Sequence, residues 1–380
     1  MSNRPKIFLL GPTAPYRGGI AETQAAFARA LDALSVDVTV INFKKLYPSF
    51  LFPGKSQFVE QPSPLAQPQS HRLLHTYNPL NWLKVARWIN RQQPDYVVFR
   101  YWTPFTAPCW WGIRLFLNAT IKTIGLVDNW EPHEKRWSDR TLNTLFKKSC
   151  DGFATLSERV ANQIKKDTSK PVWTGFHPIH DKLPKAVDQL EARQRLGLPQ
   201  NRKIAAFVGL VRPYKGVELL IEAFALAQKQ TPELFLLIAG EFYTPLAPYQ
   251  KLIAEYNLQE HLCLMPEFLS SETLRDAVCA ADFICQPYKK ATQSGITPLA
   301  YAYKRPLIVS DVDGLSTPIN TDQSGRIVAG DAQLWAEALT TFTETSVLEH
   351  HRQQIQKAIP NYSWSRFAKN FITALAQSFA

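Results

Sequence analysis

Cysteine is scarce in this 380-residue chain, and the number of cysteines is odd. No pair has the C-x-x-C spacing, so we expect neither a disulfide framework nor a structural zinc site. We interpret the thiols as reduced and mostly buried in a cytosolic protein. The five cysteines are Cys109, Cys150, Cys263, Cys279 and Cys285.

Long apolar runs are missing as well. The best examples, at 205–211 and 234–239, are much shorter than the roughly 20 residues that a membrane-spanning helix needs. The first six residues are polar and lead straight into a strand, so we expect no signal peptide. A Rossmann G-x-G-x-x-G is also absent, which argues against a dinucleotide oxidoreductase.

Acidic residues are few in the first part of the chain. Residues 1–170 hold 23 Lys and Arg against 12 Asp and Glu, and residues 171–380 hold 20 of each sign. The whole net charge of +11 therefore lies in the first part. A one-sided field attracts anionic partners. We expect an anionic membrane surface at the inner face or a lipid-diphosphate acceptor. Solubility alone is the alternative, and no nucleic-acid motif is present.

Strands and helices alternate along the chain. A strand at 6–10, a Gly/Pro-rich loop, a helix at 21–34 and a strand at 36–42 form a unit typical of a parallel α/β sheet. A Pro-flanked stretch at 173–184 is expected to link two domains, because the same alternation begins again at residue 203. Two doubly wound halves predict a two-lobed α/β protein with a central cleft.

The first motif is a basic loop that follows a buried strand. Residues 208–216 read VGLVRPYKG and lead into the helical sequence VELLIEAF. Arg212 and Lys215 supply positive charge, Gly209 and Gly216 free the backbone, and the helix offers its N-terminus. Oriented N–H groups, a helix dipole and two cations can hold a diphosphate. An ordinary solvated loop is the alternative.

This string resembles the donor-site signature of family 4 glycosyltransferases, which have the GT-B fold. In that family a strand ends in a Gly–Arg element, followed by Lys-Gly and a Leu-Ile-Glu-Ala-Phe helix. The resemblance implies that Arg212 and Lys215 hold the donor diphosphate. The departure is that Arg212 lies three residues after Gly209 instead of directly after it. The resemblance covers most of the chain and is strongest from about 200 to 330.

A second block, at 286–315, is similar to the same family in frame. Most members carry two glutamates, separated by seven residues, that contact the donor sugar or ribose. Here those positions hold Ala291 and Leu299, so both carboxylates are missing. The donor sugar and base are therefore left open.

A small polar turn remains in this block. It comprises residues 292–295, Thr-Gln-Ser-Gly, at the start of a helix. Its N–H groups and hydroxyls can hold a phosphate. We predict donor contacts from Gln293, Ser294, Gly295 and Thr297, with a simple helix cap as the alternative.

The glycine-rich loop at 11–22, GPTAPYRGGIAE, resembles the family's first loop. In the family a Gly-Gly pair there approaches the donor phosphate and the acceptor from the N-terminal lobe. Gly18 and Gly19 permit close backbone approach, and Arg17 adds charge on the acceptor side.

A polar cluster at 128–137, DNWEPHEKRW, follows a predicted strand. Many relatives have a His facing the acceptor at the position of Asp128. We predict that Asp128 or His133 accepts a proton from the acceptor or orients its hydroxyl. Asn129 and Glu134 are predicted to lie on the acceptor side. A structural role for the histidine is the alternative.

Two further features resemble functional motifs. Asp311 and Asp313 form an Asp-x-Asp, but we interpret it as a turn and expect neither a required metal nor a cofactor, the nucleotide-sugar being a substrate. The aromatic residues at 101–105 with Trp110 and Trp111 suggest a buried helix behind a strand, with a lipid interface as the alternative.

These features predict the following organisation. Residues 1–176 form an acceptor-side domain, residues 177–360 form a donor domain, and residues 361–380 form a helix that returns to the first domain. The expected activity is retaining transfer of a sugar from a nucleotide-sugar to a hydroxyl of a polysaccharide or lipid-linked glycan. The alternatives are a sugar-nucleotide epimerase of the same fold, a non-catalytic nucleotide-sugar-binding protein and, on charge alone, a nucleic-acid binder.

Overall fold

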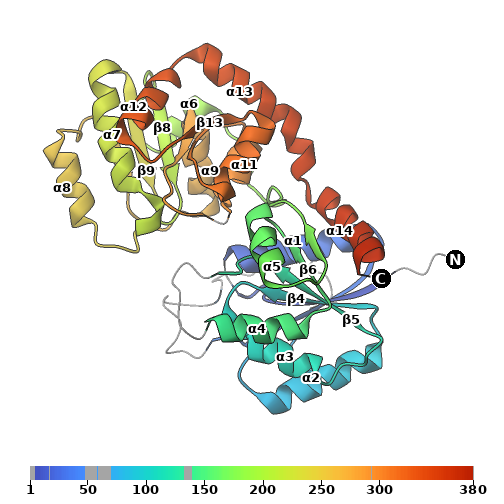
Figure 1. Cartoon of the computed structure of the whole chain (residues 1–380). Helices are drawn as coiled ribbons and strands as arrows, with labels where there is room; N and C mark the ends of the chain where they lie inside the picture. Colours follow the sequence, from blue (N-terminus) through green and yellow to red (C-terminus); the bar gives the residue numbers. More distant parts are fainter. Residues whose placement is uncertain are drawn as a thin grey trace. The chain divides into compact units, whose positions relative to one another are not determined.

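The structure is a computed structural model that describes residues 5–16, 18–47, 58, 70–131, 139–291 and 293–379. It divides into two compact units (Figure 1). The first unit comprises residues 1–178 together with 363–380, and the second comprises residues 179–362. The boundaries therefore lie two residues beyond those expected from the sequence.

The first unit is built on a seven-stranded sheet in the order β3-β2-β1-β4-β5-β6-β7. Every neighbouring pair in it is parallel. The strands are β1 (Lys6–Leu10), β2 (Asp37–Lys45), β3 (Ser70–His75), β4 (Tyr96–Tyr101), β5 (Lys122–Val127), β6 (Gly152–Thr155) and β7 (Val172–Thr174). Part of the stretch expected as a linker is thus the edge strand β7.

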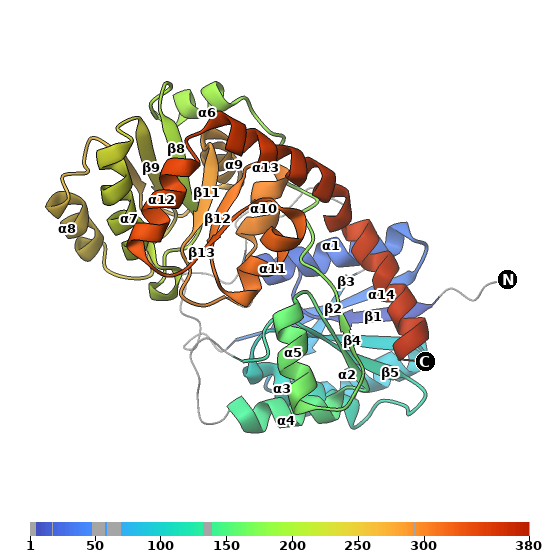
Figure 2. The same cartoon turned by 45° about the horizontal axis from the view of Figure 1, so that its top comes forward.

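Helices cover both faces of this sheet (Figures 1 and 2). They are α1 (Gly19–Ala33), α2 (Pro79–Gln92), the short 3-10 helix η2 (Pro104–Thr106), α3 (Ala107–Arg114), α4 (Asp139–Ser149), α5 (Glu158–Asp167) and α14 (Trp364–Ser378). Because side chains alternate along a strand, Phe8 and Phe99 lie in the core beneath α2–α4 while Ile7 and Val98 lie in the core beneath α1 and α14.

The last helix, α14, packs on α1 and completes the core on that side. Phe371 lies edge-on to Phe27, with ring centroids 5.1 Å apart, and Phe367 contacts the same ring at 5.3 Å. Trp173 of β7 contacts Phe371 as well. The end of the chain is thus part of the first unit's core.

The second unit contains a six-stranded sheet in the order β10-β9-β8-β11-β12-β13, again parallel throughout. Its strands are β8 (Lys203–Val208), β9 (Leu234–Ala239), β10 (Leu262–Met265), β11 (Phe283–Gln286), β12 (Leu307–Ser310) and β13 (Gly325–Val328). Every residue of β9 is buried, as is typical of a parallel strand covered on both faces.

The helices of the second unit complete its alternating pattern. They are α6 (Gln189–Arg195), η3 (Pro213–Lys215), α7 (Val217–Gln230), α8 (Ala247–Glu255), α9 (Ser271–Ala280), α10 (Ile296–Ala302), α11 (Asp313–Asp322), α12 (Ala332–Thr341), α13 (Thr345–Ala358) and η4 (Ile359–Tyr362). Two doubly wound parallel α/β units are therefore confirmed.

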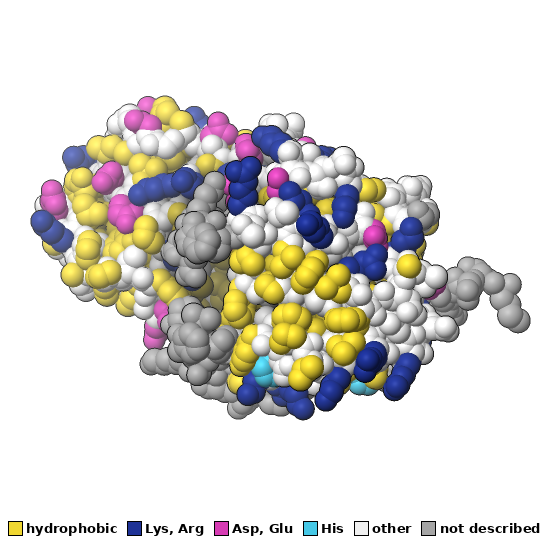
Figure 3. All heavy atoms as spheres, turned by 60° about the horizontal axis from the view of Figure 1, so that its bottom comes forward, with side chains coloured by type: hydrophobic (Ala, Val, Ile, Leu, Met, Phe, Trp, Pro, Cys, Tyr) yellow, Lys and Arg dark blue, Asp and Glu magenta, His cyan; other side chains and the backbone are white. Residues whose placement is uncertain are grey.

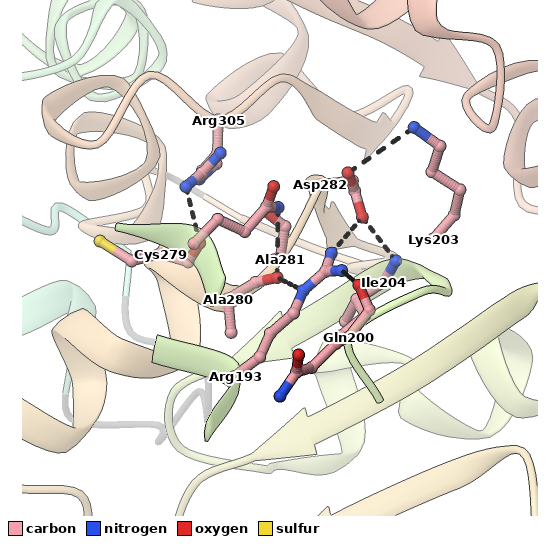
Figure 4. A network of polar contacts seen from close by, with 10 residues as sticks. Arg193, Gln200, Lys203, Ile204, Cys279, Ala280, Ala281, Asp282 and Arg305 are labelled. Carbon is pink, nitrogen blue, oxygen red and sulfur yellow. Dashed lines mark hydrogen bonds and ion pairs between the residues drawn. The ribbon is translucent and has the colours of Figure 1, made fainter. Parts of the chain in front are cut away.

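A buried polar network holds the amino ends of β8 and β11 together (Figure 4). The Arg193 guanidinium lies 2.8 Å from the Asp282 carboxylate, and it also donates hydrogen bonds to the carbonyls of Ala280 and Gln200. The same carboxylate accepts from the N–H of Ile204 at 2.7 Å. All these groups lie at the strand ends where chains enter the sheet, so we assign the network a structural role.

Candidate functional site

The second unit reverses its strand order between β8 and β11, which are hydrogen-bonded neighbours. In an open parallel sheet, the chains leaving two such strands diverge and leave a crevice at their carboxyl ends, which is where ligands bind. Gly209 follows β8, and the segment from Pro287 to Gly295 follows β11. The structure therefore brings the two predicted donor-site segments to one edge of one sheet.

Lys215 is the half-buried cation of this edge. Its ammonium lies 4.9 Å from the centroid of the Tyr288 ring and 5.9 Å from that of Phe207. Aromatic faces attract a cation but do not neutralise it. Among the described residues no carboxylate forms an ion pair with Lys215, so its charge is available to an anion.

Arg212 provides a second such charge. Its side chain is exposed, and its guanidinium lies over the ring of Tyr243, 4.7 Å from the centroid. No carboxylate of the described chain pairs with it either. Both cations precede α7, a helix of 14 residues whose N-terminus adds a partial positive charge.

Gly216 joins the two segments of the site and requires the conformation of glycine. Its φ is +64°, and a Cβ placed there would lie 2.1 Å from the carbonyl oxygen of Pro287. Beside it, the N–H of Lys289 donates to the carbonyl of Tyr214 at 2.7 Å. Close backbone contact between the two loops thus holds Lys215 beside Tyr288.

Ser294 is held by a residue that the sequence analysis did not select. Gln286, the fully buried last residue of β11, donates from Nε2 to Ser294 Oγ at 2.8 Å, while its Oε1 accepts from the Thr297 hydroxyl at 2.9 Å. Ser294 Oγ also accepts from the N–H of Ile296 at 3.2 Å. With those two bonds accepted, the serine hydroxyl can still donate its proton, either to the Tyr288 hydroxyl or to a ligand oxygen.

The Tyr288 hydroxyl lies 3.5 Å from Ser294 Oγ, and the Tyr288 ring lies beneath the Lys215 ammonium. Tyr288 therefore connects the serine to the lysine. The sequence did contain a signal for Gln286, because a Gln at the carboxyl end of an otherwise apolar strand requires a buried hydrogen-bond partner.

The remaining predicted donor residues have varied surroundings. Thr297 is buried and donates inward to Gln286, and a Cβ at Gly295 would meet no described atom within 4 Å. The buried Oε1 of Gln293 has no hydrogen-bond partner among the described residues. Since buried polar atoms are normally satisfied, a ligand hydroxyl or amide is a suitable partner for it. Thr292 lies outside the described residues.

The positions of the two missing glutamates are apolar and closed. Ala291 and Leu299 are both buried in the second unit's core. A carboxylate at either position would need a new polar partner. The polar side chains at this position of the site therefore come from Gln286, Ser294 and Thr297, and not from carboxylates.

In the first unit, Gly18 and Gly19 lie where β1 leads into α1. Gly18 has a φ of +104°, which favours glycine, and its carbonyl accepts from the N–H groups of Ala21 and Glu22. A Cβ at either glycine would meet no atom of the described residues within 4 Å. Arg17 lies outside the described residues.

Asp128 has a structural partner that the sequence analysis did not anticipate. Its two carboxylate oxygens bind the Arg100 guanidinium at 2.6 and 2.5 Å, and both side chains are buried. Arg100 also donates to the Thr23 hydroxyl of α1 at 3.0 Å. Both oxygens of the carboxylate are thus occupied by Arg100, which gives Asp128 a structural role, and its predicted catalytic role stays a prediction.

The described structure does not bring together the other residues that were predicted to lie on the acceptor side. Asn129 is half-buried next to Asp128. His133 and Glu134 lie outside the described residues. Within the described ranges, no group of three or more His, Cys, Asp or Glu side chains is arranged to hold a metal ion.

Residues 188–361 match the family model "Glycosyl transferases group 1". The matched residues lie in the second unit, which holds Lys215, Arg212 and the Gln286–Ser294 pair. The resemblance to family 4 glycosyltransferases inferred from the motifs is confirmed.

Curated relatives match about half of the chain. The chain is 30% identical over 189 residues to a D-inositol 3-phosphate glycosyltransferase of Corynebacterium efficiens, covering 47% of this chain and 43% of that protein. It is 27% identical over 205 residues to the enzyme of that name from Salinispora arenicola, covering 50% and 45%. The match thus spans less than half the length of these relatives.

Solved structures match this chain over nearly its whole length. Sucrose-phosphate synthase of Thermosynechococcus elongatus has a TM-score of 0.72 at 19% identity, covering 98% of this chain and 99% of that one. Anabaena HepE in complex with UDP and glucose has a TM-score of 0.73 at 13% identity, covering 98% and 100%. The fold is therefore GT-B.

Proposed function

We propose that this protein is a retaining glycosyltransferase that moves a sugar from a nucleotide-sugar to a hydroxyl of a polysaccharide or lipid-linked glycan. The observation that carries the proposal is the pair of cations without carboxylate partners, Lys215 and Arg212, at the strand-order reversal of a group 1 domain. We place this activity in the cytoplasm. The proposal needs no metal ion.

The proposed chemistry breaks the bond between the sugar's anomeric carbon and the diphosphate oxygen. The acceptor oxygen forms the new bond on the same face of the sugar, and its proton passes to the departing phosphate. Lys215 and Arg212 stabilise the negative charge that develops on the leaving group, and the Ser294 hydroxyl donates to it. Preorganised charge of this kind is commonly the largest catalytic contribution. No step requires a carboxylate nucleophile, so the apolar Ala291 and Leu299 are compatible with it.

Related proteins support a nucleotide diphosphate donor. HepE was solved with UDP and glucose, and starch synthase IV of Arabidopsis thaliana was solved with ADP and acarbose. The curated relatives are named for transfer to an inositol phosphate. These names define the first donors and acceptors to try.

Donor binding is tested by thermal shift with UDP-, GDP-, ADP- and dTDP-sugars. A ligand that binds only the native state raises the melting temperature by mass action. We expect one nucleotide class to raise it, and we expect Lys215→Ala to abolish the shift. The matched control is Lys229→Ala, because Lys229 lies in the last turn of α7, at the opposite end of that helix. No shift with any nucleotide at millimolar concentration would overturn the donor assignment.

Transfer itself is tested with the donor so identified, with and without acceptor glycans, and the products are analysed for anomeric configuration. We expect a retained linkage and full activity in EDTA. An epimerised nucleotide-sugar formed without acceptor would instead support an epimerase. Tight donor binding without turnover in every acceptor condition would support a non-catalytic binding protein.

A further inference from the structure

Large apolar side chains are exposed on the helices that cover one face of the first sheet. Leu80 at the start of α2 is 73% exposed, and Leu115 and Phe116, directly after α3, are 56% and 47% exposed. Trp82 and Trp111, on the same two helices, are partly exposed. In Figure 3 hydrophobic side chains gather on this face of the first unit, with Lys and Arg side chains along its margin. Contiguous apolar surface of this kind marks an interaction site more often than single exposed residues do.

The exposed residues are held in place by packing between α2 and α3. Gly112 leaves room for the Trp82 ring, since a Cβ there would lie 2.2 Å from it. The Asn90 side chain donates to the carbonyl of Phe116 at 2.8 Å and accepts from the N–H of Asn118 at 2.9 Å. Leu115 and Phe116 are therefore exposed on a fixed segment and not on a fraying helix end.

A row of cations lies beside the apolar residues. On α2 the exposed positions Leu80, Lys84, Arg87 and Arg91 follow one another at helical spacings of four, three and four residues, which places them along one side of the helix. Among the described residues none of the three cations pairs with a carboxylate. Between Glu60 and Asp128 the sequence contains a single acidic residue, Asp95.

We infer that this surface binds an anionic lipid bilayer. We call it the α2–α3 face and define it by Leu80, Leu115 and Phe116 with Lys84, Arg87 and Arg91. The apolar side chains enter the boundary between headgroups and acyl chains, and the cations contact lipid phosphates from the margin, their aliphatic stems lying along the apolar surface. None of the described helices is long and apolar enough to cross a membrane, so the contact we infer lies at the surface of the bilayer.

The charge pattern favours a bilayer over a second copy of the chain. In a two-fold dimer the same patch faces itself, which would bring the two rows of cations close together at an electrostatic cost. An anionic bilayer neutralises them instead, because each Lys or Arg near such a surface is attracted to the lipid phosphates.

Vesicle flotation of the full chain without nucleotide tests this inference, so its result does not depend on donor binding. The vesicles are phosphatidylcholine alone, or phosphatidylcholine mixed with phosphatidylglycerol. We expect binding to the mixed vesicles that weakens with salt. The double variant Leu115→Ser/Phe116→Ser and the double variant Lys84→Glu/Arg87→Glu should each lower the bound-to-free ratio about tenfold or more. Phe268→Ser is the matched control, because Phe268 is 70% exposed in the second unit, and it should bind like the parent protein.

Failure of the parent protein to float with the anionic vesicles would overturn the inference, as would equal binding by all variants. A dimer in light scattering that Phe116→Ser dissociates would assign the face to a second copy instead. Because the replaced side chains are exposed, the melting temperatures of the variants should stay near that of the parent protein. If the serine pair melts lower, Leu80→Ser supplies the same test with the most exposed apolar side chain of the face.

Discussion

At the scale of single residues, the proposed donor site contains a buried glutamine. Gln286 is fully buried and uses both ends of its amide, one toward Ser294 and the other toward Thr297. In the proposed mechanism it affects donor binding without touching the donor, because it holds the Ser294 hydroxyl in place. Gln286 is therefore a positioning residue in the proposed mechanism.

Gln286→Leu keeps the size of the side chain and removes both hydrogen bonds. We expect donor affinity to fall about tenfold, since one hydrogen bond is worth about 1 kcal/mol and the two hydroxyls lose their fixed direction. Isothermal titration with the donor measures the loss. Gln228→Leu is the control, because Gln228 lies near the far end of α7 beside His261. Equal affinities in the two variants would remove Gln286 from the site.

Two glycines with the same backbone conformation allow backbone strain to be measured separately from a steric clash of an added Cβ. Gly216 and Gly197 have φ values of +64° and +65°, but only Gly216 has a carbonyl, that of Pro287, in the space of a Cβ. Gly197→Ala should cost about 1 kcal/mol of unfolding free energy. Gly216→Ala should cost more than about 2 kcal/mol and weaken donor binding. Urea unfolding of both variants measures the difference, and equal losses would contradict the close contact.

At the scale of elements, α14 stabilises a unit that lies far away in sequence. Its aromatic residues pack against Phe27 of α1 and Trp173 of β7. Gly152 of β6 leaves room for Phe379, whose ring would lie 2.2 Å from an added Cβ. The core on this face of the first sheet is incomplete without the helix.

Phe371→Ala should lower the unfolding free energy by about 3–5 kcal/mol, because a fully buried ring is replaced by a cavity. Phe268→Ala, in an exposed position, should change it by less than about 0.5 kcal/mol. Thermal unfolding by circular dichroism compares them. A Phe371→Ala protein as stable as the control would contradict this packing.

At the scale of the whole molecule, all five cysteines are free thiols, and we expect them to react slowly. Burial raises the pKa of Cys109, Cys150, Cys263 and Cys285. Only Cys263 is partly exposed. A raised pKa means that the thiolate is scarcer than in a free cysteine at the same pH, and alkylation requires the thiolate.

Native protein treated with iodoacetamide at pH 8 should therefore be labelled first at Cys263, and the rate should rise with pH. Unfolded protein should be labelled at all five positions. Peptide mass spectrometry gives the order of labelling. Rapid labelling of Cys109 or Cys285 in the native protein would show that these thiols are accessible.

The sequence alone determined the alternation of strands and helices, the two parallel α/β units and the location of Lys215 and Arg212 after a buried strand. These features depend on neighbouring residues: apolar periodicity, glycines in loops and cations before a helix. They were also enough to recognise the family. The order of the strands decides which loops meet, and that order depends on pairing between distant segments.

Only the tertiary structure showed that Gln286 holds Ser294, and that Gly216 lies against Pro287. It also changed the interpretation of Asp128, which the sequence placed at a strand end and the fold pairs with Arg100, 28 residues away. Likewise Trp110 is buried, as expected for a helix behind a strand, whereas Leu115 and Phe116 are exposed beside a row of cations. Burial and charge pairing arise when distant segments pack, so local patterns identify the chemical groups but not their partners.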